Sequence, residues 1–206
     1  MTKHRSLINY IALQAAQASN NGLYHGRMGM VLALYSYGMT KGDERLCEYA
    51  KDLLQASTGD YYDAGIGLED GLAGIGLGFT LLYQAGMFRD DLNDLLSEID
   101  TKIMRFDPRR MTDFSFRKGA SGVLYYINTR KTIDQDFFSI DKRYIAELEH
   151  SISLYIDECE LSETLFSNLT SPKWEMEDYL EKEVGIDNGS AYFLIQESYD
   201  KIFSRQ

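Results

Sequence analysis

An eight-residue motif occurs three times in the chain, and each copy runs into an apolar helical stretch. The copies are Gly22-Leu-Tyr-His-Gly26-Arg-Met-Gly29, Gly67-Leu-Glu-Asp-Gly71-Leu-Ala-Gly74 and Ser115-Phe-Arg-Lys-Gly119-Ala-Ser-Gly122. Their first Gly-x-x-Gly glycines, at 26, 71 and 119, lie 45 and 48 residues apart, a period typical of a helical hairpin array. A degenerate fourth copy, Gly185-Ile-Asp-Asn-Gly189-Ser-Ala-Tyr192, follows after 70 residues, with Tyr192 in place of the second glycine.

The residues after each motif indicate helices that are buried on all sides. In the second copy, small residues form a stripe at Gly71, Gly74 and Gly78, and such a stripe lets neighbouring helices approach closely. The opposite face is apolar at the spacing of a buried helix face. Its residues are Leu72, Ile75, Phe79 and Leu82. We therefore expect the motif helices to form an inner layer.

Amphipathic helices between the motifs indicate an outer layer. Asp90 or Asp91 is a suitable N-cap for a helix over residues 92–103, in which Asp100 is expected to point away from the apolar stripe. Asp141 is the corresponding cap of a later helix. Because the inner helices are built of smaller residues than the outer ones, the array is expected to curve.

These patterns predict an all-α fold: an α/α hairpin array forming a partial, arc-like α/α toroid of about four hairpins with Gly-x-x-Gly at the inner-helix starts. We expect residues 1–206 to form a single domain, with clear repeats over 20–130 and a less regular part over 131–206. Short extended pieces are expected only at residues 61–62 and 136–140. An arc leaves an apolar edge, which residues 160–184, containing Trp174, could cover, or which could support a homo-oligomer.

The composition is that of a folded chain with an acidic surface. Hydrophobic residues make up 44% of the 206 residues and only 2 residues are proline, so long helices are permitted almost everywhere. The net charge of −11 would repel nucleic-acid backbones and anionic membranes, and no segment approaches a membrane span. Cys47 and Cys159 have no metal-ligand spacing around them and are expected to stay reduced. We therefore expect a cytoplasmic protein with no nucleic-acid or membrane partner.

The motifs, in their flanks, order and spacing, resemble those of the lanthionine synthetase C-like family. The resemblance covers residues 20–130 and takes in Gln84-Ala-Gly-Met-Phe88 and Asp107-Pro-Arg-Arg110, which are similar to segments of short bacterial members. It implies an α/α toroid with Gly-x-x-Gly at the mouth of the inner barrel. It also implies a role in the modification of a ribosomally made peptide.

The chain departs from the zinc site of the family's cyclases, in which two cysteines and a histidine hold the ion and a Cys-His pair directly precedes a motif glycine. Here the corresponding pairs are Tyr24-His25, Glu69-Asp70, Arg117-Lys118 and Asp187-Asn188. With no cysteine in a ligand position, activation of a thiolate by zinc cannot be carried over. We therefore expect neither a metal nor another cofactor.

The repeat places the residue before each first motif glycine at an equivalent point, so these residues are expected to face a common mouth. The predicted binding residues are His25, Asp70, Arg117, Lys118, Asp187 and Asn188, with Glu69 beside them. Such a polar surface suits a peptide, bound by a non-catalytic or accessory component. A pure interaction module, with a partner protein in place of the peptide, stays open.

An enzyme is the alternative, acting on a sugar or peptide with paired carboxylates, Glu69 or Asp70 with Asp113 or Asp187, and with His25 beside them. Carboxylates bonded to backbone N–H groups or to the Arg117-Lys118 pair would instead indicate a structural role.

Structural interpretations of single residues also stay open. Asp70 and Asn188 are suitable helix caps. His25 could bind a metal with Asp70 and Asp187 or be a hydrogen-bonded structural histidine. Arg117-Lys118 could bind an anionic group or pair with Glu69 and Asp70.

Overall fold

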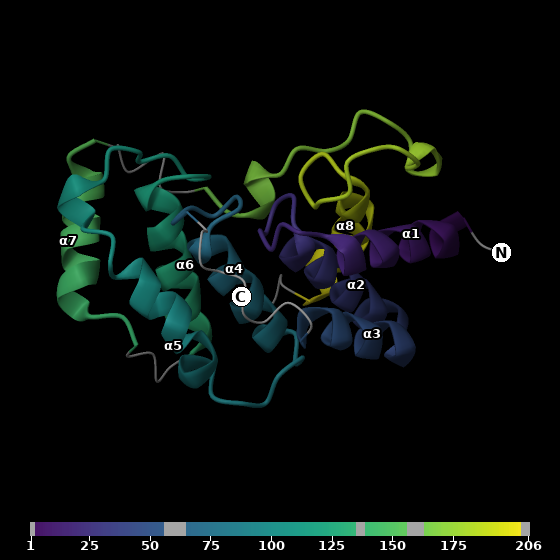
Figure 1. Ribbon diagram of the computed structural model, residues 1–206, viewed down its shortest axis with the longest axis horizontal. Helices are drawn as coiled ribbons and strands as arrows, with labels where there is room; N and C mark the ends of the chain where they lie inside the picture. Colours follow the sequence, from purple (N-terminus) through teal and green to yellow (C-terminus); the bar gives the residue numbers. More distant parts are fainter. Residues whose placement is uncertain (1–2, 56–64, 135–138, 156–162, 203–206) are drawn as a thin grey trace. The chain divides into compact units, whose positions relative to one another are not determined.

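The computed structural model describes residues 3–55, 65–134, 139–155 and 163–202, which form eight α-helices and no strand (Figure 1). The helices are α1 (Lys3–Gln17), α2 (Arg27–Lys41), α3 (Glu44–Gln55), α4 (Leu72–Gln84), α5 (Leu92–Ile103), α6 (Ala120–Ile133), α7 (Lys142–Ser153) and α8 (Ser190–Ile202), with the short 3-10 helices η1 (Pro108–Arg110), η3 (Phe166–Asn168) and η4 (Met176–Asp178). The predicted all-α class is confirmed for these residues. The extended pieces predicted at 61–62 and 136–138 lie outside them, and residues 139–140 form no strand.

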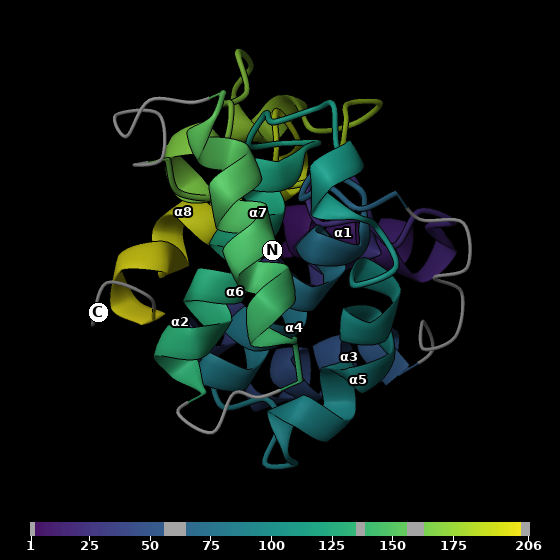
Figure 2. The ribbon, with the colours of Figure 1, turned by 90° about the vertical axis from the view of Figure 1, so that its left-hand side faces the viewer.

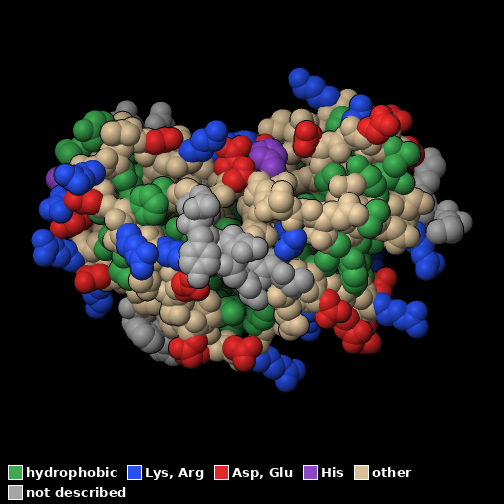
Figure 3. All heavy atoms as spheres, in the orientation of Figure 1, with side chains coloured by type: hydrophobic (Ala, Val, Ile, Leu, Met, Phe, Trp, Pro, Cys, Tyr) green, Lys and Arg blue, Asp and Glu red, His purple; other side chains and the backbone are tan. Residues whose placement is uncertain are grey.

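None of the helices in the described part of the chain has the length and apolar character needed to cross a membrane. On the face drawn in Figure 3, acidic and basic side chains of the described residues are intermixed rather than gathered by sign.

The chain groups into two compact units. Unit 1 comprises residues 1–62 and 169–206, and unit 2 comprises residues 63–168. Unit 1 thus contains the first and fourth motifs with α1, α2, α3 and α8, and unit 2 contains the second and third motifs with α4 to α7. The single-domain organisation and the toroid stay predictions.

In unit 1, α2 packs against α8, so the first and fourth motif helices are in contact although they come from opposite ends of the sequence. Every residue of α2 from Met28 to Gly38 is buried. Helices α1 and α3 also pack on α2, and α1 contacts α8 as well. Part of the segment predicted to cover an edge also lies here, since the Trp174 ring meets Phe193 of α8 edge-on and the Tyr179 ring contacts Tyr10 of α1.

In unit 2, α4 packs against α6, while α5 lies on α4 and α7 lies on α6 (Figure 2). Every residue of α4 from Leu72 to Leu82 is buried, which confirms that this motif helix has no polar face. A side chain is excluded at Gly76, because an added Cβ would lie 2.7 Å from the Tyr126 ring. Asp91 caps α5 and Asp141 caps α7, as predicted, each accepting a hydrogen bond from a backbone N–H two residues on.

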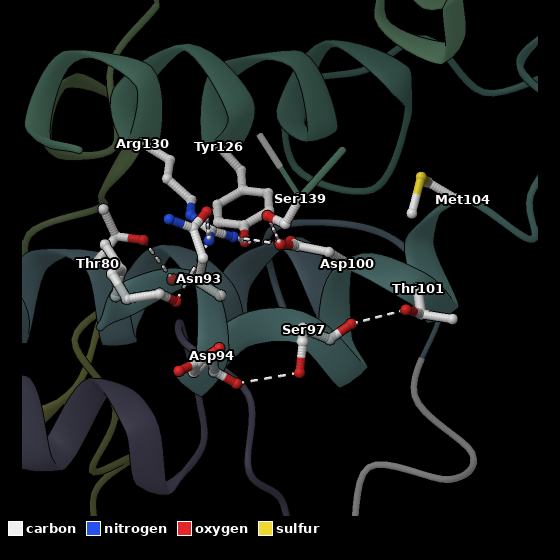
Figure 4. Close-up of polar contacts among 12 residues, drawn as sticks. Thr80, Asn93, Asp94, Ser97, Asp100, Thr101, Met104, Tyr126, Arg130 and Ser139 are labelled. Atoms are coloured by element: carbon white, nitrogen blue, oxygen red, sulfur yellow. Dashed lines mark hydrogen bonds and ion pairs between the residues drawn. The ribbon is translucent and has the colours of Figure 1, made fainter. Parts of the chain in front are cut away.

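The prediction for Asp100 is wrong. This carboxylate does not point to solvent; it is buried between α5 and α6 and ion-paired with Arg130, which is also fully buried (Figure 4). Tyr126 donates a hydrogen bond of 2.7 Å to Asp100 Oδ1, and Ser139 donates one of 2.5 Å to Oδ2. Arg130 also donates to Asn93 Oδ1 at 3.0 Å. Burial raises the pKa of Tyr126 well above its ordinary value, so the phenol stays protonated as a donor.

Three helices of unit 1 are joined at Glu197 of α8. Its Oε1 lies 2.9 Å from His4 Nε2 of α1, and its Oε2 lies 3.0 Å from Lys41 Nζ at the end of α2. Burial alone raises the pKa of this carboxyl, but the hydrogen bonds from His4 and Lys41 outweigh burial and lower the pKa below its ordinary value.

This lowered pKa predicts an acid-dependent contribution to stability. A carboxyl whose folded-state pKa is depressed stabilises the fold above its unfolded pKa, about 4.3 for glutamate, and the contribution is lost as the pH falls through the folded value. We expect the free energy of unfolding of Glu197→Gln to fall less steeply than that of the wild type between about pH 5 and pH 3. Urea unfolding at several pH values checks this. Parallel pH profiles for the two proteins would contradict it.

Candidate functional site

Each of the four motif loops contains an equivalent backbone hydrogen bond. In each loop the N–H of the first helical residue donates to the carbonyl seven residues earlier. The bonds are Arg27 to Asn20 (2.8 Å), Leu72 to Gly65 (2.8 Å), Ala120 to Asp113 (3.0 Å) and Ser190 to Glu183 (2.8 Å). The degenerate fourth copy has the same bond as the others, so it is a structural repeat and not only a sequence likeness.

Through this bond a backbone carbonyl, and not a capping side chain, accepts the hydrogen bond of the first helical N–H. The N-cap of α4 is Gly71, and the N–H groups of Leu72, Ala73 and Gly74 donate to the carbonyls of Gly65, Ile66 and Gly67. Asp70 thus precedes the N-cap position and is not needed to cap these groups. In α8, the first two N–H groups donate to the carbonyls of Glu183 and Val184, so Asn188 is not needed for this purpose.

Close approach of the backbone explains why the first position of Gly-x-x-Gly is a glycine. A Cβ added at Gly71 would lie 2.6 Å from the nitrogen and 2.7 Å from the oxygen of Gly67. A Cβ added at Gly26 would likewise lie 2.7 Å from the oxygens of Asn20 and Gly22. Gly71 and Gly26 have φ values of −110° and −109°, which any residue can adopt. Space, rather than a special dihedral angle, therefore requires glycine here.

Within each unit two motif loops pair, and the same kind of backbone hydrogen bond joins them in both units. In unit 2, the Glu69 N–H donates to the Arg117 carbonyl at 2.8 Å. In unit 1, the Asp187 N–H donates to the Tyr24 carbonyl at 3.2 Å. All four residues hold the third position of their motif. The second loop therefore pairs with the third, and the fourth pairs with the first, in one common geometry.

Side-chain packing repeats in the same way. The second-position residues, Leu68 and Ile186, lie against the second glycine of the partner loop, where an added Cβ would be 2.9 Å and 3.2 Å away. Those glycines are Gly122 and Gly29. A small residue at this point lets the paired loops close on each other.

Exposure separates the third and fourth positions of every loop. The third-position side chains are buried or half-buried, whereas the fourth-position residues are all exposed. The fourth-position residues are His25, Asp70, Lys118 and Asn188. Each loop thus presents one polar residue to solvent next to a more buried one. Their convergence on one mouth stays a prediction.

In unit 2, Glu69 forms an ion-paired cluster with the third motif loop. Its Oε1 lies 3.7 Å from Arg117 Nη1 and its Oε2 lies 3.6 Å from Lys118 Nζ. Arg117 Nη2 also donates to the carbonyl of Asn168 at 2.6 Å. Of the predicted pairing of Arg117-Lys118 with Glu69 and Asp70, the part with Glu69 is present. Asn168, the anchor of this arginine, lies 51 residues away and had no signal in the sequence.

In unit 1, Asp187 is the corresponding anchor. Its Oδ1 accepts a hydrogen bond of 2.7 Å from the Thr170 N–H, and its Oδ2 lies 3.7 Å from His25 Nε2. The Asn188 N–H donates back to the Thr170 carbonyl at 2.8 Å. The Asp187 side chain is only 7% exposed, so it holds the loop to residue 170 rather than offering a free carboxylate. Nothing in the sequence marked Thr170 as this partner.

Asp113 has a local structural role. Its Oδ1 accepts a hydrogen bond of 2.8 Å from the Ser115 N–H, and its own carbonyl caps α6. The hydrogen bonds from Ser115 lower the pKa of this carboxyl, so it is ionised at neutral pH and unsuited to act as a general acid.

No family model, curated protein or solved structure matches this chain. The resemblance to the lanthionine synthetase C-like family therefore stays a prediction from the sequence.

Proposed function

We propose that this chain is a lanthionine synthetase C-like protein without the zinc-thiolate site, which binds a peptide as a non-catalytic or accessory component in the modification of ribosomally made peptides. The observation that carries the proposal is that four loops with one backbone path each expose a polar side chain at the same position. A toroid arrangement of the motif helices and a cytoplasmic location are parts of this proposal.

The chemistry of the exposed residues suits a peptide. His25 and Asn188 carry groups that donate and groups that accept hydrogen bonds, Asp70 accepts, and Lys118 donates. A peptide backbone offers both donors and acceptors to such a set. The pairing bonds and the buried or half-buried third-position residues fix the loops beforehand, which reduces the entropy lost on binding.

The ion pairs and hydrogen bonds of the carboxylates considered for an enzyme support a binding role over a catalytic one. Glu69 is paired with Arg117 and Lys118, while Asp113 and Asp187 accept backbone N–H bonds. A glycosidase-type mechanism requires two carboxyl groups that act on the substrate. Glu69, Asp113 and Asp187 are thus engaged in holding the loops.

Peptide binding by the loops is testable with a matched pair of triple variants. The loop variant carries His25→Ala, Asp70→Asn and Lys118→Ala. The control variant carries His150→Ala, Asp94→Asn and Lys142→Ala, which changes the same residue types at exposed helical positions outside the motifs. Peptides selected on the wild type from a displayed random library are labelled, and their affinities are measured by fluorescence anisotropy.

We expect some of the selected peptides to bind the loop variant about tenfold more weakly or worse, which corresponds to about 1.4 kcal/mol, and to bind the control variant as they bind the wild type. Unfolding curves of all three proteins should coincide, because the substituted side chains are exposed. If every selected peptide binds the folded loop variant with wild-type affinity, the loops are not the binding site.

A further inference from the structure

Unit 1 contains a groove of about 810 Å³ that is separate from the motif loops. It is lined by α1, by the C-terminal end of α2 and by the start of α3. The motif loop lies at the other end of α2, and the distance along the helix from Arg27 to Lys41 is about 21 Å at 1.5 Å per residue. The groove therefore falls outside the function proposed above and does not depend on it.

The groove follows α1 lengthwise. The residues that α1 contributes form two rows at four-residue spacing, which are neighbouring rows on one helix face: positions 4, 8 and 12, and positions 5, 9 and 13. Residues 5 to 13 span about 12 Å at 1.5 Å per residue. An elongated site of this length suits an extended or helical segment of a partner better than a compact small molecule.

One end of the groove is basic. Arg5, Lys41 and Arg45 line it, against one acidic residue, Asp43. Lys41 and His4 meet at Glu197, and α3 begins three residues after Lys41, so Arg45 lies at the same end as His4 and Arg5. Neither Arg5 nor Arg45 has an ion pair within the described part of the chain. Because Lys41 is paired with Glu197, the excess at this end is one positive charge, from Arg5 and Arg45 against Asp43, in a chain whose net charge is −11.

The other end is apolar and exposed. Leu13 is 54% exposed and Tyr49 is 40% exposed, and the Tyr49 hydroxyl lies 3.5 Å from the Ala12 carbonyl, which places both side chains at the far end of the groove from His4. Exposed large apolar side chains beside a groove are typical of a contact surface. The two ends thus differ in the chemistry that they would recognise.

We propose that this groove binds an acidic peptide segment of a partner protein, with its carboxylates on Arg5 and Arg45 and its apolar side chains on Leu13 and Tyr49. Charge complementarity selects this occupant. Arg5 and Arg45 have no carboxylate paired to them among residues 3–55, 65–134, 139–155 and 163–198. An acidic segment would supply carboxylates to both arginines.

The test compares selections from one displayed library of random peptides of about 12 residues, enough for three helical turns. The targets are the wild type, the double variant Arg5→Glu/Arg45→Glu, and the control Arg110→Glu/Lys142→Glu, which makes the same change in net charge at exposed positions of unit 2. We expect peptides that combine Asp or Glu with apolar residues to be enriched on the wild type and the control and not on the arginine variant. Equal acidic enrichment on all three would overturn the proposal.

Affinity measurements make the test quantitative. The most enriched acidic peptide is expected to bind the arginine variant at least about tenfold more weakly, and the exposed-site variant Leu13→Ser several-fold more weakly. The milder Arg5→Gln/Arg45→Gln double variant, checked for folding by circular dichroism, should give the same direction. Unchanged affinity in both arginine variants contradicts the proposal.

Two further measurements separate peptide binding in the groove from binding at the motif loops and from self-association. The triple loop variant is expected to retain wild-type affinity for the acidic peptide; loss of binding there would place that peptide at the motif loops and overturn the groove as its site. Sedimentation velocity is expected to give the same mass for the wild type and the arginine variant. A dimer that dissociates on substitution of Arg5 and Arg45 would identify a second copy of the chain as the occupant and contradict the proposal.

Discussion

Replacing Arg130 with methionine is expected to lower the free energy of unfolding by about 3–5 kcal/mol, the cost of leaving a buried charge without its partner. The side chains of Arg130 and Asp100 are 0% and 1% exposed, so water cannot take the place of the guanidinium. The substitution also removes the donor to Asn93 Oδ1 and to the Leu92 carbonyl. Urea unfolding followed by circular dichroism measures the loss.

Two variants distinguish a lost buried pair from a general effect of removing arginine. Arg143→Met removes an exposed arginine paired with Glu147 one helical turn away, and should cost at most about 0.5 kcal/mol. Adding Asp100→Leu to Arg130→Met is expected to recover part of the loss, because the unpaired carboxylate is then gone. A loss below about 1 kcal/mol for Arg130→Met would contradict the assigned role of the pair.

Gly71→Ala is expected to destabilise the protein by about 3 kcal/mol, at the upper end of the usual cost of overpacking. The added Cβ would meet the backbone of Gly67 at 2.6 Å, and backbone atoms cannot turn aside as a flexible side chain can. The strain would also move Gly67, which lies against the Lys118 backbone of the paired loop. The free energy of unfolding from urea titration is again the measurement.

The same loop contains its own control. At Gly65 an added Cβ meets nothing within 4 Å, so Gly65→Ala is expected to be neutral or to stabilise by up to about 1 kcal/mol through the unfolded chain. Gly26→Ala should be as harmful as Gly71→Ala, since the first motif loop follows the same path. Similar free energies for the 65 and 71 variants would show that close backbone approach is not why the motif needs glycine.

Several local features of the chain follow from its amino-acid sequence. The buried stretch of α4, the caps at Asp91 and Asp141 and the exposure of the fourth-position residues follow from spacing and from the preferences of single residues. The structure places Gly71 rather than Asp70 at the N-cap of α4, and the first helical N–H groups bond to loop carbonyls, which the cap preference of a single residue does not reveal. The prediction for Asp100 was wrong because an acidic residue is expected to be exposed unless its ion-pair partner is known.

The amino-acid order by itself determined the helical class, the glycine-opened helices and the polar residue that each loop presents, because these depend on neighbours within a few turns. Only the tertiary structure decided that the second loop pairs with the third and the fourth with the first, that Arg130 neutralises Asp100, and that Thr170 holds Asp187. These partners are 17 or more residues apart. Contacts of that range are formed by packing of whole helices, and they leave no periodicity along the chain from which they could be predicted.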